Sequence, residues 1–282
     1  MIMSLLTMKR RQQLAMVLRY VFIIIFALIA LFPIYEMVAT SLKNEVDAFS
    51  IPPKWIFKPT LKNYQAVLFE GKFFTYFFNS IVVAITSTVI SVAAGALGAY
   101  SLARFRFTGK KLIVLGTLLM RMVPPVILVV PIFLLYNRLG ITNARMSLAM
   151  VYVALNLPFN IWVLRTFIME VPKELEESAQ IDGCSHMLTF RKIILPLIAP
   201  GISVASIFTF RISWNEFILS LVLTNRNTRT LPVAVSLFLT DTGTEWGKIT
   251  AIATIIAIPA FIFTFTAAKS LIMGLTAGAV KG

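Results

Sequence analysis

Residues 20–38 read YVFIIIFALIALFPIYEMV, an apolar run in which Glu36 is the only charged residue. An α-helix needs about 20 apolar residues to cross a bilayer, so this run has the length of a membrane span. Basic residues precede it at 9–11 and 19, as they also precede the apolar region of a secretory signal. The run is longer than the apolar region of such a signal, roughly 7–15 residues. It therefore predicts a retained first span.

Five further apolar stretches of similar length follow. The six predicted spans lie near residues 19–41, 73–102, 112–136, 147–169, 197–222 and 248–272. Long continuous runs without strict alternation indicate helices rather than the strands of a membrane barrel. We therefore expect an all-α integral membrane protein, with one transmembrane domain over residues 1–282 and no separate soluble domain.

The composition agrees with a protein that uses lipid as solvent. Hydrophobic residues make up 58% of the 282 residues, charged residues 13%, and the mean hydropathy is +0.85. The net charge of +14 comes from short basic runs between apolar stretches, which argues against a nucleic-acid surface. One cysteine, Cys184, and one histidine, His186, exclude an internal disulfide framework and a His/Cys metal cluster.

The orientation is predicted from the basic flanks, because lysine and arginine are nearly balanced between the two sides. The first span usually carries most weight, and its N-terminal flank is basic and free of acids. The loop at 103–111, with Arg104, Arg106, Lys110 and Lys111, repeats this pattern on the same side. We therefore expect both termini in the cytoplasm.

The longest chemically informative segment is 170–196, EVPKELEESAQIDGCSHMLTFRKIILP. Acids in its first turns favour a helix there, with Leu175 and Ala179 on one face. Gly183 is placed to end this helix in a left-handed cap, and a second short helix is expected from Ser185 through Phe190. The segment predicts a cytoplasmic helix-turn-helix that docks in the groove of a partner.

The same segment resembles the EAA loop of binding-protein-dependent ABC importer permeases, whose pattern is EAA-x3-G-x9-I-x-LP. The spacing matches throughout, and Ser178 in place of alanine is the one departure. The resemblance implies a type I ABC importer permease fold, in which this loop couples to ATPase subunits. The implied coupling residues are Glu177, Ser178, Ala179, Asp182, Gly183, Ile193, Leu195 and Pro196.

Other stretches are similar to the carbohydrate-uptake branch of that family, and within it to G-type maltose-permease subunits. They include 214–217 (WNEF), Leu231-Pro232 and the terminal 274–282 (GLTAGAVKG). The resemblance implies a bacterial cytoplasmic-membrane complex with a second, F-type permease, two ATPase subunits that bind ATP and Mg²⁺, an extracytoplasmic solute-binding protein and a sugar substrate. No G-x4-GK[ST] phosphate loop occurs in the chain, so it is expected to be a transporter subunit without cofactor or enzymatic activity of its own. The tail residues Gly278, Lys281 and Gly282 are expected to reach the ATPases.

A substrate path is predicted from ionisable and aromatic residues in or near the spans, because such charges usually face a cavity or a partner. The candidates are Glu36, Arg211, Trp214, Asn215 and Glu216. A structural polar network or a set of membrane-interface anchors would explain the same residues. At the level of function, the alternatives are an ABC importer for a non-sugar solute and a secondary transporter. The second would show inverted repeats and ion-coupled acids, which are not visible here.

Overall fold

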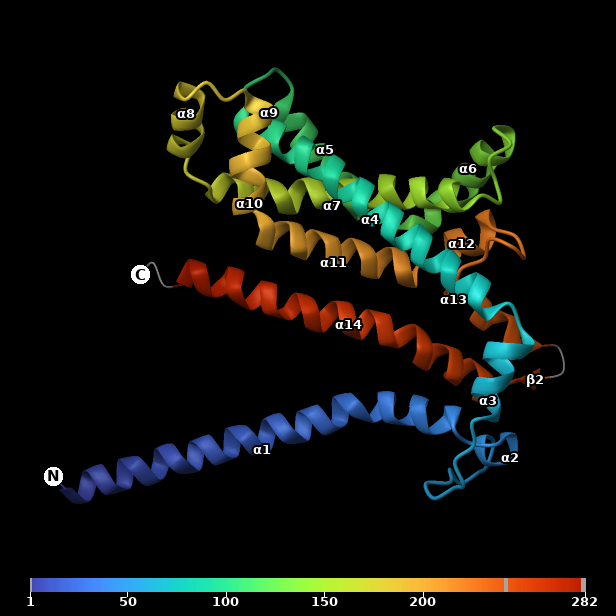
Figure 1. Cartoon of the computed structure of the whole chain (residues 1–282). Coiled ribbons are helices and arrows are strands. Elements are labelled where there is room, and N and C mark those ends of the chain that lie inside the picture. Colours follow the sequence, from blue (N-terminus) through green and yellow to red (C-terminus); the bar gives the residue numbers. More distant parts are fainter. Residues whose placement is uncertain (1, 241–242, 280–282) are drawn as a thin grey trace. The chain divides into compact units, whose positions relative to one another are not determined.

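The computed structural model describes the backbone of residues 2–240 and 243–279, and the side chains of 12–239 and 244–266. Two compact units are formed, one from residues 1–71 and 238–255 and the other from 72–237 and 256–282. Each unit is described by itself below, with the helix and strand labels of Figure 1.

The first unit is built around the C-terminal end of a long helix. Its elements are α1 (Ile2–Ser41), α2 (Glu45–Ala48), α3 (Lys62–Gln65), the π-helical η1 (Ala66–Glu70), the paired strands β1 (Leu239–Thr240) and β2 (Gly243–Thr244), and the first turns of α14 (Trp246–Ala279). Asn63 on α3 donates to the carbonyl oxygens of Ser41 and Lys43, at 2.9 and 2.8 Å. These bonds satisfy carbonyl groups where α1 ends, which would otherwise lack partners.

The second unit holds most of the remaining helices and the rest of α14. They are α4 (Phe73–Arg104), α5 (Lys110–Met122), α6 (Pro125–Arg138), α7 (Arg145–Glu170), α8 (Glu174–Ile181), α9 (His186–Thr189), η2 (Phe190–Ile194), α10 (Leu195–Leu197), α11 (Ala199–Asn215), α12 (Ile218–Leu223), α13 (Leu231–Val235) and the 3-10 turn η3 (Ser236–Phe238), which ends at the first unit. Helices α4, α7 and α11 run side by side (Figure 1).

Close packing of α4 against α7 depends on small residues. A Cβ on Gly95 would lie 2.7 Å from the Cβ of Asn160, and one on Gly98 would lie 3.3 Å from the side chain of Ile161. Small residues let membrane helices approach closely. Ala94 belongs to the same small-residue stretch but is exposed.

Hydrogen bonds between buried polar side chains join the same three helices. Asn160 on α7 donates to Ser91 Oγ on α4 at 2.7 Å and accepts from Thr209 Oγ1 on α11 at 2.9 Å. One layer further along, Ser87 Oγ donates to Ser213 Oγ at 3.0 Å. Such bonds between helices stabilise membrane bundles modestly, by about 0.6 kcal/mol each on average.

Within the described residues, four helices are long and apolar enough to span a membrane: Gln12–Ser41, Phe73–Arg104, Arg145–Glu170 and Trp246–Thr266. Counting two bent helix pairs as one span each raises the number to as many as six. The expectation of an all-helical chain holds except for the two short strands.

The predicted span 112–136 is not one straight helix. It consists of α5 and α6, which are bent by 97° at the break between them. Val123 has extended backbone angles (φ −74°, ψ 118°), as expected for a residue before proline, and Pro124 has no amide to continue α5. The predicted span 197–222 is also divided, because α11 ends at Asn215 and α12 begins at Ile218.

Candidate functional site

The segment 170–196 folds as the expected helix-turn-helix, which we call the hairpin. Helix α8 ends at Ile181, and Gly183 follows with a φ of +85°, in the left-handed region that glycine adopts without strain. Ser185 caps the second arm by accepting from the amide of Leu188 at 3.4 Å. This arm continues through α9 into η2 as far as Ile194, beyond the predicted end at Phe190.

A buried ion pair fixes the hairpin to the end of α4. The Arg104 guanidinium donates to Glu176 Oε1, and the two side chains are only 9% and 7% exposed. Tyr100 donates its hydroxyl to Glu176 Oε2 at 3.0 Å. Arg104 Nη2 also donates to the carbonyl of Val171 at 2.7 Å, where the chain enters the hairpin. The first arm of the hairpin is thereby held at two points.

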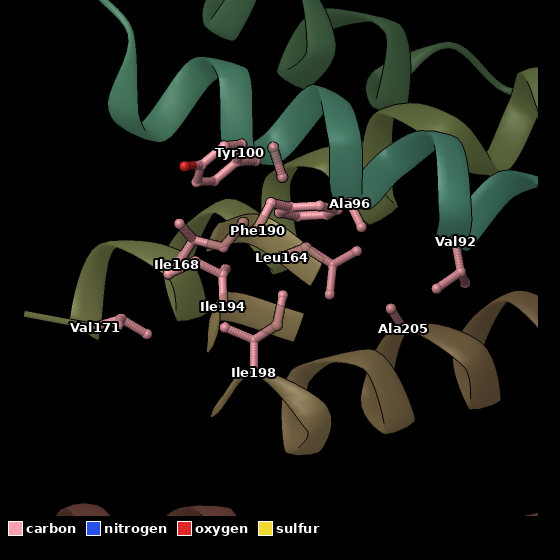
Figure 2. Close-up of a cluster of buried hydrophobic side chains, with 11 residues drawn as sticks. Val92, Ala96, Tyr100, Leu164, Ile168, Val171, Phe190, Ile194, Ile198 and Ala205 are labelled. Atoms are coloured by element: carbon pink, nitrogen blue, oxygen red, sulfur yellow. The ribbon is translucent and has the colours of Figure 1, made fainter. Parts of the chain in front are cut away.

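Aromatic packing holds the second arm at the same place. The rings of Tyr100 and Phe190 lie 4.9 Å apart, and Phe105 packs edge-on against both Tyr100 and His186. Figure 2 shows Tyr100 over Phe190, within a cluster of buried side chains from α4, α7, η2 and the start of α11. Both arms therefore rest on one end of α4.

The coupling residues named by the sequence divide into exposed and buried sets. Glu177, Ser178, Asp182 and Gly183 are exposed, and so is Pro196, whereas Ile193 and Leu195 are half-buried. Ala179 is buried inside this chain, 6% exposed. Ala179 therefore packs within this chain.

Leu175 and Ala179, which the sequence places on one face of α8, differ in burial. Leu175 is 45% exposed, and the residue buried with Ala179 is Glu176, at 5%. Sequence reasoning missed Glu176, Arg104 and Tyr100 as structural partners. A helical spacing of three between Glu176 and Ala179 was the one available signal, and it does not by itself predict a buried carboxylate.

A cavity of about 370 Å³ opens between the α5–α6 break and the end of α11, and we call it the break cavity. Its lining comes from the α5–α6 break, the middle of α7 and the end of α11: Met120, Arg121, Met122, Val123, Pro124, Pro125, Tyr152, Leu155, Asn156, Ile212, Ser213 and Glu216. Of the predicted substrate-path residues, only Glu216 lines it.

Glu216 also organises the break between α11 and α12. Its Oε2 accepts from the Tyr152 hydroxyl at 2.6 Å and from the amide of Ser220 at 3.1 Å, and its Oε1 accepts from the amide of Leu219 at 2.9 Å. The carboxylate thus satisfies amides at the first turn of α12, where negative charge is favourable.

The other predicted substrate-path residues lie elsewhere. Trp214 is 1% exposed, packs on Phe210 and Phe77, and donates its Nε1–H to the carbonyl of Ile256 at 3.1 Å. It is a core residue of the second unit, so the expectation that its ring faces a solute is not met here. Arg211 and Asn215 are exposed on α11.

The remaining candidates lie outside this arrangement. Glu36 belongs to the first unit, where its Oε2 lies 3.8 Å from Lys43 Nζ. Gly278 is part of α14. Lys281 and Gly282 lie outside the described residues. Among the residues whose side chains are described, no group of three or more His, Cys, Asp or Glu comes together as a metal site.

Residues 91–273 match the sequence profile of the family "Binding-protein-dependent transport system inner membrane component". The chain belongs to this family. The match covers more than half of the chain and includes α7, the hairpin and the break cavity from Met120 to Glu216. The resemblance inferred from the EAA-type spacing is thereby confirmed, and the chain is a multi-pass component of the inner membrane.

Several members of this family are similar to the chain over nearly its whole length. The diacetylchitobiose uptake system permease protein of Streptomyces coelicolor is 38% identical over 89% of this chain and 92% of its own. The trehalose/maltose transport system permease protein of Thermococcus litoralis is 36% identical over 97% and 99%.

The fold is shared with solved ABC transporters. A chain of a bacterial ABC transporter that imports the acidic polysaccharide alginate superposes with a TM-score of 0.76 at 22% identity, covering 92% of this chain and 97% of that one. A chain of the MetNI methionine ABC transporter superposes with a TM-score of 0.58 at 16% identity, over 74% and 96%. The permease fold is therefore common to transporters of different solutes.

Proposed function

We propose that this chain is one of two permease subunits of an ATP-driven carbohydrate importer in the bacterial cytoplasmic membrane. It would pair with an F-type permease, two ATPase subunits that bind ATP and Mg²⁺, and an extracytoplasmic solute-binding protein. Support comes from relatives named for sugars, at 36–38% identity over most of both chains. The sequence similarity at 214–217, 231–232 and 274–282 points to the same branch.

The proposed topology has six spans in one permease domain over residues 1–282, with both termini and the hairpin in the cytoplasm. The acid-free basic flank of the first span supports this orientation. The bent pair of α5 and α6 then counts as one crossing. Irregular backbone at membrane depth is tolerated where it lines a cavity, and the α5–α6 break does line one.

The observation that carries the proposal is the division of the hairpin into an anchored side and a free side. Glu176 fixes it to the end of α4 and Ala179 is buried, while Glu177, Ser178 and Asp182 stay exposed for a partner. A coupler must be rigid to transmit a bias between two states. Movement of the docked ATPases would then be transmitted through the Glu176–Arg104 pair to α4, a helix of 32 residues. The tail at 278–282 would add a second contact with the ATPases.

Uptake by the reconstituted complex tests this function. The chain would be co-expressed with the permease, ATPase and binding-protein genes beside its own and assayed in proteoliposomes with radiolabelled maltose, trehalose, diacetylchitobiose and methionine. ATP-dependent accumulation of a sugar, lost when the ATPase phosphate-loop lysine is replaced, is expected. Accumulation of methionine alone would favour the non-sugar importer, and uptake without ATP would favour a secondary transporter.

A further inference from the structure

We propose that a pocket in the first unit binds a phospholipid whose head group carries a primary ammonium. The pocket, which we call the first-unit pocket, has about 540 Å³ and lies between the last turns of α1, residues 48–51 and the first turns of α14. All of its lining residues belong to the first unit. The inference concerns the lipid around the chain and does not depend on which solute is transported.

Glu36 supplies a carboxylate that the protein leaves incompletely satisfied. It is the only acid of the candidate span Gln12–Ser41, and its side chain is 29% exposed where it lines the pocket. Its Oε2 is a buried atom with no hydrogen-bond partner among the described residues. Lys43 Nζ lies 3.8 Å from that oxygen, too far for a hydrogen bond, and sits over the Phe57 ring at 5.3 Å. Because buried polar atoms and charges near a span are usually paired, Glu36 marks a place for a cationic hydrogen-bond donor.

Two aromatic residues favour an ammonium beside this carboxylate. Phe49 and Trp246 line the pocket and are 52% and 47% exposed. The face of an aromatic ring attracts a cation within about 6 Å of its centre. A primary ammonium also brings three N–H donors, which a trimethylammonium lacks. The combination of Glu36 with these rings therefore suits a primary ammonium and disfavours a head group with a net negative charge.

The depth of the pocket points to a lipid as the source of that ammonium. Glu36 lies five residues before Ser41, where α1 ends, so it is about 8 Å from that end along the helix axis. The interfacial layer on each side of the hydrocarbon core is about 5–8 Å thick. Trp246, the first residue of α14, is of a type enriched at that level. The carboxylate therefore lies at the level of the lipid head groups.

Exposed apolar residues beside the pocket provide a surface for the acyl chains. Ile29 and Phe32, which are 67% and 51% exposed, precede Glu36 by seven and four residues and so share its face of α1. Ile51 and Ile56 are 96% and 94% exposed in the loop after α2. Apolar surface of this kind is unfavourable in water and stable against lipid. A lipid whose ammonium meets Glu36 therefore lays its chains along this face of α1.

Lipid binding by the assembled importer tests the pocket. The purified complex of the chain with its partner subunits would be analysed by native mass spectrometry while phosphatidylethanolamine, phosphatidylcholine or phosphatidylglycerol with identical acyl chains is added. We expect the first phosphatidylethanolamine to bind at least about tenfold more tightly than either other lipid, the scale of one charge-assisted hydrogen bond. Phosphatidylcholine lacks N–H donors and phosphatidylglycerol lacks a cation, so the comparison separates hydrogen bonding from charge.

Two substitutions assign this preference to the pocket. Glu36→Gln keeps the shape of the side chain and removes its charge, so the preference should disappear. Trp246→Leu keeps an apolar side chain without an aromatic face and should weaken phosphatidylethanolamine binding roughly fivefold. Glu45→Gln is the matched control, because Glu45 is an exposed acid of the first unit that does not line the pocket. It should bind lipid as the wild type does.

Three results would count against the site. Equal binding of the three lipids by the wild type, or an unchanged preference in Glu36→Gln, would overturn it. Release of the bound lipid by an equal concentration of glycerophosphoethanolamine, which has no acyl chains, would overturn its assignment to a lipid.

Discussion

At the residue scale, the hairpin depends on one glycine and one buried carboxylate. Gly183 was predictable, because the spacing places a glycine just after the end of α8. Its φ of +85° lies in the left-handed region, which disfavours residues with a Cβ. Glu176 was not predictable in the same way. It is one of three acids in the first turns of α8, and only the position of Arg104, 72 residues earlier, selects it for burial.

Replacement of Gly183 should act through the backbone alone. A Cβ at this position would meet nothing within 4 Å, so the cost arises from the left-handed conformation, about 1–2 kcal/mol for an ordinary residue. We expect Gly183→Val to abolish ATP-driven uptake while the chain still reaches the membrane and binds its permease partner. Gly183→Asn is the control, since asparagine visits this region more easily. Normal uptake by the valine variant would argue against a rigid turn.

The Glu176–Arg104 pair should show strong coupling in a double-mutant cycle. Glu176→Leu leaves a buried guanidinium without its carboxylate, which typically costs about 3–5 kcal/mol. Arg104→Met combined with Glu176→Leu should recover most of that loss, because both charges are then absent. Thermal denaturation of the purified chain in detergent measures all three variants. Additive effects of the two single substitutions would mean that the charges do not act as a pair.

At the element scale, the helices were predictable and the size of their bends was not. The apolar runs locate α1, α4, α7 and α14. Pro158 and Pro259 remain inside helices, whereas Pro124 separates α5 from α6 by a 97° bend. Proline thus indicates where a bend is possible, but the packing of the surrounding helices decides its size. Tertiary contacts also bury Trp214. Its burial could not be predicted from the sequence, because periodicity does not distinguish a core aromatic residue from one that lines a path.

Replacing each of three glycines on α4 and α5 by alanine should lower the amount of assembled complex according to how closely other atoms surround that glycine. Gly95→Ala places a Cβ 2.7 Å from Asn160 Cβ, and Gly98→Ala places one 3.3 Å from Ile161. Gly116→Ala meets nothing within 4 Å and gains helix propensity. Overpacking costs about 1–3 kcal/mol, so the amount of assembled complex should fall most for Gly95, less for Gly98, and not at all for Gly116. A loss for Gly116→Ala as large as for Gly95→Ala would contradict the close contact of α4 with α7.

At the scale of the whole molecule, α4 connects two ends of the second unit, and a different set of residues contacts each end of the helix. Arg104 at its C-terminal end pairs with Glu176 of the hairpin. At the other end, Lys72 donates to Asn227 Oδ1 at 2.9 Å, and Asn79 donates to the carbonyls of Asn227 and Arg229. The 32 residues of α4 extend about 48 Å at 1.5 Å per residue, more than the hydrocarbon thickness of about 30 Å.

The hairpin and the loop at 224–230 should therefore face opposite sides of the membrane. Cys184 is half-exposed in the hairpin, and Asn225 is exposed in the loop. A membrane-impermeant maleimide should label Cys184 in inside-out vesicles and not in intact cells, from which the outer membrane, if present, has been removed. In a Cys184→Ser background, Asn225→Cys should show the reverse pattern. Labelling of both positions from the same side would contradict a single crossing by α4, and labelling of Cys184 from outside would reverse the proposed orientation, because the hairpin must face the compartment that holds ATP.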